Sequence, residues 1–356
     1  MSSANPVESF DVVIAGAGVG GAACALALAH DYPLRILVLE RQAGPGKINR
    51  GDSLLPAVTA QLAEWNALDR FRAAGARPLA KMQVWHYRAG LLLDSRLDDL
   101  DGSAPYLVLP HPEIERTLIE AAQATARVEV RYGCQVTRLL FEGNRVRGVA
   151  ASGDKSGEQL IHAGLLIGAD GSNSTVRSAL RISFCRVPYK HSYFGLEMER
   201  PKTYEDAMRI ELHPAGGILV VPNPSLDRVG LGVLVYPPEE ELFRSGVLEA
   251  KVAAIQQRSP LFASCRAFPR GAHLYKLSRF HAAHYAAHGA ALLGDAVHIT
   301  NPTAGQGMTM AIEDAAALAR HVGPALASGK RGPVLDAALQ AYERERRPLN
   351  AALIRW

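Results

Sequence analysis

The sequence predicts an α/β protein with a mostly antiparallel β-sheet inserted into its middle. Strand and helix patterns alternate at both ends of the chain, whereas residues 187–276 read mostly as strands. Three glycine-marked segments follow one another far apart in the chain: G-A-G-V-G-G at 16–21, G-A-D-G at 168–171, and G-D-A-V-H with P-T-A-G-Q-G within 294–307. This order predicts that distant parts of the chain return to one extended binding site.

The first glycine segment lies between a strand and a helix. Residues 10–15 form an apolar, β-branched run typical of a buried strand, and residues 22–30 form a helix of small side chains and leucines. In this setting Gly16 permits a tight turn, Gly18 lets the backbone approach a pyrophosphate, and Gly21 lets the helix and strand pack closely. We expect the pyrophosphate on the free amides at the helix N-terminus.

An acidic residue ends the second strand. Residues 35–39 are followed by Glu40, about twenty residues after the last glycine, where an acid that binds a ribose is expected. An acid at this place favours a free 2′-hydroxyl and therefore an ADP moiety. A glycine-rich loop without a ligand is the alternative. The strand, helix and acid together favour a dinucleotide, and the two later glycine segments point to FAD.

The other elements follow from the hydrophobic pattern in chain order. After a loop at 44–52, the pattern predicts a helix at 56–68, hairpin strands at 81–87 and 91–95, a helix at 113–124, and strands at 128–132, 136–141, 146–151 and 160–167. The middle holds strands at 191–199, 207–212, 217–221 and 229–236 and a helix at 239–257. A last strand at 290–293 precedes helices at 305–322 and 333–354.

Composition and charge narrow the function classes. The 356 residues are 48% hydrophobic and 21% charged, and the net charge of +4 is dispersed, which argues against a nucleic-acid partner. We expect no signal peptide in residues 1–8 and no membrane span, and therefore a cytoplasmic protein. The basic stretch at 343–347 is predicted to be a solvated helix face.

No metal site is predicted. The four cysteines are widely separated and are expected to be buried free thiols: Cys24, Cys134, Cys185 and Cys265. Three histidines have a spacing that imitates a metal motif, but no carboxylate accompanies them, so we expect surface side chains: His281, His284 and His288. His298, within the third glycine segment, is expected to order its loop.

The three motifs in this order resemble the single-component (group A) flavoprotein monooxygenases of the para-hydroxybenzoate hydroxylase fold, over nearly the whole chain. The resemblance implies a Rossmann-like, GR2-type FAD-binding domain and an inserted, mostly antiparallel β-sheet domain that binds the substrate. It assigns three stretches to the FAD-binding domain: 1–80, 111–182 and 285–356. Two stretches then form the substrate domain: 81–110 and 183–284.

The resemblance also implies roles for single residues. Asp295 would hydrogen-bond the ribityl chain, and residues 302–308 would wrap the isoalloxazine with a helix N-terminus at its pyrimidine edge. The remaining cofactor contacts it implies are Arg41, Arg116, Val136, Asp170, Gly305, Gly307 and Met308, with Arg177 beside Asp170 in the second motif. The residues implied nearest the chemistry are Pro302, Gly305 and Arg50.

Two features depart from the family pattern. Thr309 stands where the family usually has Asn, so we expect the flavin affinity or potential to differ. The chain ends at Trp356, soon after the last predicted helix, whereas many relatives continue, so a fragment and a minimal form are both open.

The implied activity is hydroxylation of an aromatic or similarly electron-rich small molecule with NAD(P)H and O2, through a flavin C4a-hydroperoxide. N-hydroxylation of an arylamine is included, because residues 48–56 and the Gly305 region resemble N-hydroxylases of 2-aminobenzoylacetate in secondary metabolism. The alternatives are an FAD-dependent reductase of a prenyl-type substrate and a non-catalytic FAD-binding regulator. A monomer and a homodimer are both open. Candidate substrate contacts on the inserted strands are Tyr193, Phe194, Arg209, His213 and Pro222.

Overall fold

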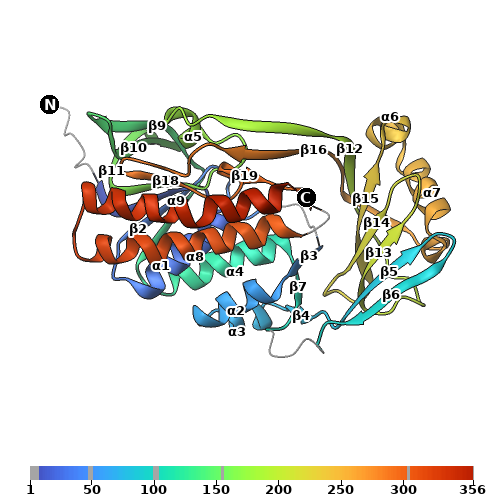
Figure 1. Cartoon of the computed structure of the whole chain (residues 1–356). Coiled ribbons are helices and arrows are strands. Elements are labelled where there is room, and N and C mark those ends of the chain that lie inside the picture. Colours follow the sequence, from blue (N-terminus) through green and yellow to red (C-terminus); the bar gives the residue numbers. More distant parts are fainter. Residues whose placement is uncertain (1–7, 47–50, 99–103, 154–155, 303–304, 356) are drawn as a thin grey trace.

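A computed structural model of the chain describes residues 8–46, 51–98, 104–153, 156–302 and 305–355. The described residues form two eight-stranded sheets and one three-stranded sheet. Figure 1 shows the two large sheets at opposite ends of an elongated molecule, with a layer of long helices beside the first. The predicted combination of an α/β fold with a second, mostly antiparallel sheet is confirmed.

The first sheet carries the glycine motifs. Its strand order is β17-β18-β11-β1-β2-β8, and the pairs from β18 to β8 are parallel. The bounds are β1 Glu8–Ala15, β2 Ile36–Glu40, β8 Val128–Tyr132, β11 Ser156–Gly168, β17 Ala286–Ala287 and β18 Ala290–Leu292, with β9 Cys134–Glu142 and β10 Arg145–Gly153 attached through β11. Residues 12–15 of β1 and 36–39 of β2 are buried, as expected of parallel strands covered on both faces.

Four helices cover one face of this sheet (Figure 1): α1 Val19–Asp31, α4 His111–Gln123, α8 Gln306–Ala327 and α9 Pro333–Ile354. Helix α1 consists mainly of Ala and Leu because it packs against both α4 and α8. The short helix α5 Thr175–Ala179 follows β11 and packs on β9.

The second sheet has the order β19-β16-β12-β15-β14-β13-β5-β6, and all its pairs are antiparallel except β13 with β5. The bounds are β5 Lys81–His86, β6 Gly90–Arg96, β12 Phe184–Glu199, β13 Ala207–Leu212, β14 Ile218–Pro222, β15 Arg228–Val235, β16 Ala267–Ala282 and β19 His298–Ile299. Strands β12 and β16 are 16 residues long. Figure 1 shows them running from the helix-covered end of the molecule into this sheet.

The two faces of the second sheet pack against different partners. Phe194, Leu231 and Val233 lie with Phe243 and Ile255 of helices α6 Pro237–Ser245 and α7 Leu248–Arg258. On the other face, Val221 packs with Val108, next to the small sheet β3 Gly51–Leu54, β7 Leu107–Pro110 and β4 Arg77–Pro78. Strand β3 contacts β14 and β15. This second face therefore looks toward the segment that follows the third glycine motif.

Several expected elements differ in detail. The helix expected at 56–68 is two helices, α2 Pro56–Glu64 and α3 Leu68–Ala73, because Asn66 between them has a φ of 54°. The helix expected at 239–257 likewise breaks at Gly246 into α6 and α7. Residues 51–54 form β3, although a loop was expected through residue 52.

Two predictions about burial are wrong. Cys185 is exposed on β12, while the other three cysteines are buried as expected. Within the stretch 343–347 on α9, Arg346 is only 5% exposed. An ion-pair network described below explains this burial. No described helix is both long and apolar enough to cross a membrane.

Candidate cofactor and substrate site

The first two glycine motifs are in direct contact. Strand β1 ends at Ala15, which pairs with Gly168 at the end of β11. Gly16 has a φ of 102°, and a Cβ placed on it would lie 2.4 Å from the Ala169 carbonyl oxygen. A Cβ on Gly21 would lie 2.0 Å from the Gly16 carbonyl oxygen. Only glycine fits at either place, so both act as predicted in bringing strand, turn and helix α1 together.

Glu40 lies at the side of this turn. Its Oε2 accepts a hydrogen bond from the Ala17 amide at 2.8 Å, and its Oε1 accepts one from the Gln42 amide at the same distance. The carboxylate is thereby fixed beside the N-terminus of α1. The structure thus brings the acid predicted to bind a ribose to the loop predicted to bind the pyrophosphate.

The second motif is joined to the third by Arg177. Asp170 accepts hydrogen bonds from the Ser174 hydroxyl and the Val176 amide, so it stabilises the start of α5. Arg177, which is buried, donates to the carbonyl oxygens of Ser172 at 2.8 Å and Ala296 at 2.7 Å. The Arg177 guanidinium therefore holds the turn that carries Asp295.

That turn presents Asp295 outward. Residues Gly294–Ala296 form a short 3₁₀ helix in which Gly294 and Ala296 are buried and Asp295 is exposed. The strand before this turn is held by helix α9, because the Tyr342 hydroxyl donates a hydrogen bond to the Leu292 carbonyl oxygen at 2.9 Å. The Asp295 carboxylate thus stands on a rigid support at the end of β18, as a contact to a ribityl chain requires.

A buried polar network lies behind the turn. Asp314 of α8 is fully buried, and its Oδ2 lies 2.6 Å from the His298 Nε2 and accepts from the Gly294 amide at 3.3 Å. Its Oδ1 accepts from Arg346 Nε at 2.8 Å and from Asn350 Nδ2 at 2.9 Å. Burial alone would raise the pKa of the Asp314 carboxyl, but His298 and Arg346 outweigh it and hold the pKa below its usual range. The carboxylate therefore stays ionised.

The start of α8 is formed by Gly305. Its φ of 64° is left-handed, and its amide donates to the Pro302 carbonyl at 3.0 Å. Among the described residues outside its own segment, a Cβ on Gly305 would come nearest to Ser53 and Leu55 of the segment at β3, at 3.9 Å, which is an ordinary van der Waals contact. One turn on, Thr309 is 5% exposed and its hydroxyl has no hydrogen-bond partner among the described residues. A helix N-terminus followed one turn later by a buried hydroxyl without a partner among the described residues fits a bound flavin.

The two arginines predicted to contact the cofactor, Arg116 and Arg41, have different surroundings. Arg116 is ion-paired with Glu113 and Glu120 of its own helix, and it is Glu115 whose side chain approaches Gly18. Arg116 is partly exposed in these pairs, and its contact with the adenosine and ribose-pyrophosphate region stays a prediction. Arg41 is exposed directly after β2.

Of two further predicted site residues, Val136 is among the described residues and Arg50 is not. Val136 on β9 is buried in the core of the first sheet, so only its backbone is available to a cofactor. Arg50 lies outside the described residues.

One wall of the site comes from the second sheet. Tyr193 lies over Gly232, where a Cβ would sit 1.6 Å from the Tyr193 hydroxyl oxygen, so the glycine makes room for the ring. His191 of β12 lies 3.4 Å through its Nε2 from Asn301 Nδ2, one residue before Pro302. Burial lowers the pKa of His191, which favours a neutral imidazole. The sequence around His191 carries no signal of this role, because only the packing of β12 brings the residue against the third motif.

The other substrate candidates lie elsewhere. Phe194 packs edge-on against Phe243, on the face covered by α6 and α7. Arg209 stacks over Trp85 on that same face, and the His213 ring lies beside Tyr87. Pro222 ends β14, paired with Val229 of the helix-covered core. Of the five candidates, Tyr193 alone lies on the wall that faces the third motif.

The three spaced histidines bind different partners. His281 lies 2.9 Å from the Tyr285 hydroxyl, His284 pairs with Glu343, and His288 pairs with Asp336. Carboxylates do accompany two of them, contrary to expectation, but each histidine belongs to a separate contact. His284 and His288 are exposed as predicted, whereas His281 is half-buried.

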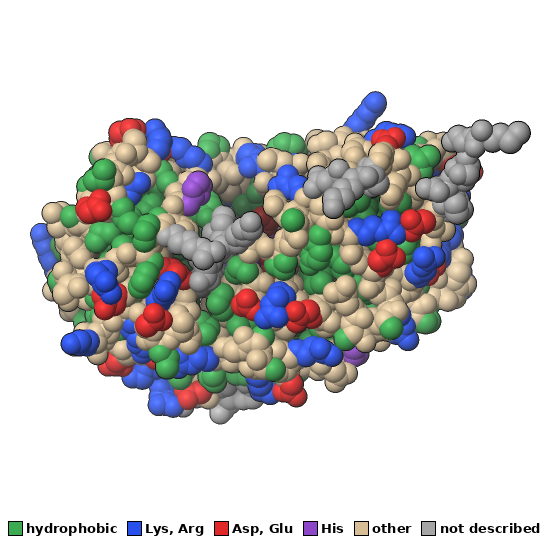
Figure 2. All heavy atoms as spheres, turned by 180° about the vertical axis from the view of Figure 1, so that it is seen from behind, with side chains coloured by type: hydrophobic (Ala, Val, Ile, Leu, Met, Phe, Trp, Pro, Cys, Tyr) green, Lys and Arg blue, Asp and Glu red, His purple; other side chains and the backbone are tan. Residues whose placement is uncertain are grey.

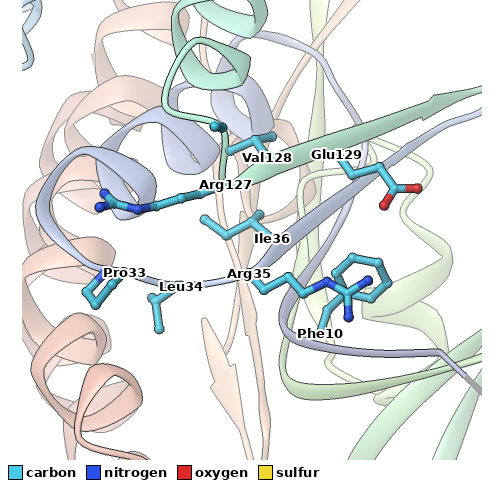
Figure 3. Close-up of a pocket in the computed structure, with 9 residues that line it drawn as sticks. Phe10, Pro33, Leu34, Arg35, Ile36, Arg127, Val128 and Glu129 are labelled. Atoms are coloured by element: carbon cyan, nitrogen blue, oxygen red, sulfur yellow. The ribbon is translucent and has the colours of Figure 1, made fainter.

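The molecule has a hollow near its middle and a separate cavity at the amino ends of two strands of the first sheet. Figure 2 shows a hollow near the middle of the molecule, with hydrophobic, Lys and Arg side chains around it. A second cavity of about 390 Å³ lies at the amino ends of β2 and β8, where Arg35 stacks on Phe10 and Arg127 donates to the Ala29 carbonyl (Figure 3). Ligands of open α/β sheets bind at the carboxyl ends of the strands, so this second cavity is not the cofactor site.

The fold and these contacts define a protein that binds an extended dinucleotide along the carboxyl ends of a parallel sheet. The chain belongs to the family described as "FAD binding domain", whose family model matches residues 9–356. It is an FAD-dependent monooxygenase. Among its relatives is the human mitochondrial ubiquinone biosynthesis monooxygenase COQ6, 29% identical over 99% of this chain and 85% of that protein. The 6-methylpretetramide 4-monooxygenase of Streptomyces rimosus is 28% identical over 95% of this chain and 80% of that one.

Solved structures agree with this class. PqsL of Pseudomonas aeruginosa, described as a probable FAD-dependent monooxygenase, is 25% identical with a TM-score of 0.82, covering 98% of this chain and 94% of that one. PqsL in complex with 2-aminobenzoylacetate is 26% identical with a TM-score of 0.81 over the same shares. The resemblance to single-component aromatic monooxygenases is confirmed, and the reductase alternative is not favoured.

Proposed function

We propose that this monooxygenase hydroxylates a small aromatic or similarly electron-rich molecule in the space between the third glycine motif and the second sheet. The observation that carries the proposal is the contact between His191 of β12 and Asn301, because it places a sheet face directly against the segment expected to hold the flavin ring. The relatives named above support an aromatic substrate, and the complex of PqsL with 2-aminobenzoylacetate supports inclusion of arylamines.

In this proposal the chain binds every part of FAD, from the ADP moiety to the flavin ring. Gly16, Gly18 and Gly21 with Glu40 bind the ADP moiety, because bare backbone and an acid suit a diphosphate and a ribose. The Asp295 carboxylate accepts hydrogen bonds from the ribityl hydroxyls. The amides at Gly307 and Met308 in the first turn of α8 stabilise negative charge on the pyrimidine edge of the ring. Further contacts come from Asp170, from Arg41, and from the backbone of Val136.

When bound, FAD supplies the redox chemistry: it accepts a hydride from NAD(P)H and activates O2. The chain's own residues bind and orient the two partners. Pro302 and Gly305 shape the space beside the flavin ring. A larger residue in place of Gly305 would displace the ring. Tyr193 and His191 form the facing wall, and their rings exclude water from the substrate. Arg50 is assigned to the same space.

The organisation of the chain is proposed on the same basis. The FAD-binding domain comprises residues 1–80, 111–182 and 285–356, and the substrate domain comprises residues 81–110 and 183–284. We place the enzyme in the cytoplasm as a monomer or homodimer.

The decisive experiment traces the source of the oxygen atom that enters the product. Enzyme, NADPH or NADH, and a panel of phenols and anilines, 2-aminobenzoylacetate included, are incubated under 18O2 and the products are analysed by mass spectrometry. One labelled atom in the product supports the proposal. A product that contains new oxygen without the label contradicts it. Complete turnover without O2 also contradicts it and favours reduction of a prenyl-type substrate.

A further inference from the structure

We propose that Glu115 limits the affinity of this protein for FAD, because its carboxylate faces the place where the diphosphate binds. The inference rests on the proposed position of the ADP moiety at Gly18. It assigns opposite effects to two acids at the same loop. Glu40 strengthens FAD binding, and Glu115 weakens it.

Three contacts with described residues place the Glu115 carboxylate beside the glycine loop. Its Oε2 accepts a hydrogen bond from the Gly46 amide at 2.8 Å, and its Oε1 lies 3.2 Å from His111 Nε2. A Cβ placed on Gly18 would lie 3.8 Å from the same Oε1. The side chain of Glu115 is 14% exposed, so it is largely enclosed between α4, the segment after β2 and the glycine loop.

Gly18 is the N-cap of α1, a helix of 13 residues with no acidic side chain in its first turn. The free amides there attract an anion, and the missing side chain at Gly18 lets a diphosphate come close. A carboxylate in van der Waals range of that approach repels the diphosphate, and in a partly enclosed place water screens the repulsion only in part.

Glu40 differs from Glu115 in what its carboxylate faces. Its oxygens accept hydrogen bonds from the Ala17 and Gln42 amides at the side of the turn, and the ribose presents neutral hydroxyl donors there. An acid facing hydroxyl donors stabilises the complex, whereas an acid facing phosphate oxygens destabilises it. The two carboxylates therefore act with opposite sign.

The test is a titration of the apoprotein with FAD, followed by flavin fluorescence, for the wild type and four variants. Glu115→Gln removes the charge but keeps an oxygen acceptor for the Gly46 amide. We expect its Kd for FAD to fall about tenfold, and the gain to shrink as NaCl rises toward about 1 M, where charges are screened within a few ångströms. Glu142→Gln removes a charge from an exposed side chain that pairs with Arg147, and its Kd should equal that of the wild type.

The third variant separates two kinds of failure. Glu40→Gln should weaken FAD binding. If it does and Glu115→Gln binds FAD no more tightly than the wild type, the inference about Glu115 is overturned. If Glu40→Gln leaves the Kd unchanged as well, the proposed position of the ADP moiety is wrong. A gain in Glu115→Ala that Glu115→Gln lacks would assign the effect to the Gly46 contact, and it too would overturn the proposal.

Discussion

The His298 imidazole and the Asp314 carboxylate lie 2.6 Å apart, and both side chains are fully buried. His298 belongs to the third glycine motif and Asp314 to helix α8, so the pair joins the turn that carries Asp295 to the helix whose N-terminus faces the flavin space. Arg346 of α9 adds the positive charge that keeps the carboxylate ionised. His298 thus orders its loop, as its place in the motif predicts.

Asp314→Asn should destabilise the fold and weaken FAD binding together. Removing one partner of a buried ion pair costs about 3–5 kcal/mol, because Arg346 loses its buried counter-charge and keeps only the partly exposed Glu313. Urea unfolding of the apoprotein measures the first effect and FAD titration the second. Glu345→Gln, which breaks a partly exposed pair with Arg320, is the control and should cost at most about 1 kcal/mol. Equal losses in the two variants would contradict a special role for Asp314.

Asp295→Ala should weaken FAD binding by about 1.5–3 kcal/mol, the range for a hydrogen bond to a charged group. Isothermal titration with FAD checks the prediction. Asp69→Asn, on the exposed surface of α3, serves as the control. An unchanged Kd in Asp295→Ala removes this residue from the site.

Gly305→Ala should uncouple NAD(P)H oxidation from hydroxylation. Its left-handed φ of 64° strains a side chain, and the new methyl group lies 3.9 Å from Leu55 and Ser53, beside the segment proposed to hold the flavin ring. Gly329→Ala is a matched control, with a φ of 69° and no atom near its Cβ. Both variants should lose similar stability, but only Gly305→Ala should release more hydrogen peroxide per NAD(P)H consumed. The same ratio in both would show that backbone strain alone is responsible.

The His281 imidazole should make the fold sensitive to acid. Burial, with Arg347 nearby, lowers the pKa of His281 to about 4 in the folded state, against an ordinary value of 6.5. The unfolded chain therefore binds a proton first, and stability is lost as the pH falls from 6.5 to 4. His281→Asn should flatten the fall in melting temperature over this window, whereas the exposed His162→Gln should not. Parallel curves for His281→Asn and the wild type would contradict the assignment.

The fold and the path of the cofactor were predictable because they depend on local rules. Gly16 and Gly21 stand where any side chain would clash with backbone, and a strand, a turn and a helix around them can form only one kind of unit. The first glycine motif follows β1 and the second follows β11. The two strands pair in parallel, which brings both motifs to the same edge of the sheet. The acid at the end of β2 is likewise fixed by its distance from the glycines.

What only the tertiary structure decided is the direction of charged side chains. Arg346 stands in the sequence E-R-E-R-R, which is typical of a solvated helix face, yet the packing of α9 on α8 buries it against Asp314. On α4, Glu115 and not its neighbour Arg116 faces the glycine loop, because a rotation of one residue along a helix is about 100°. The sequence by itself determined where the backbone must turn and what it binds. The partners of its buried charges come from segments far apart in the chain, and only folding brings them together.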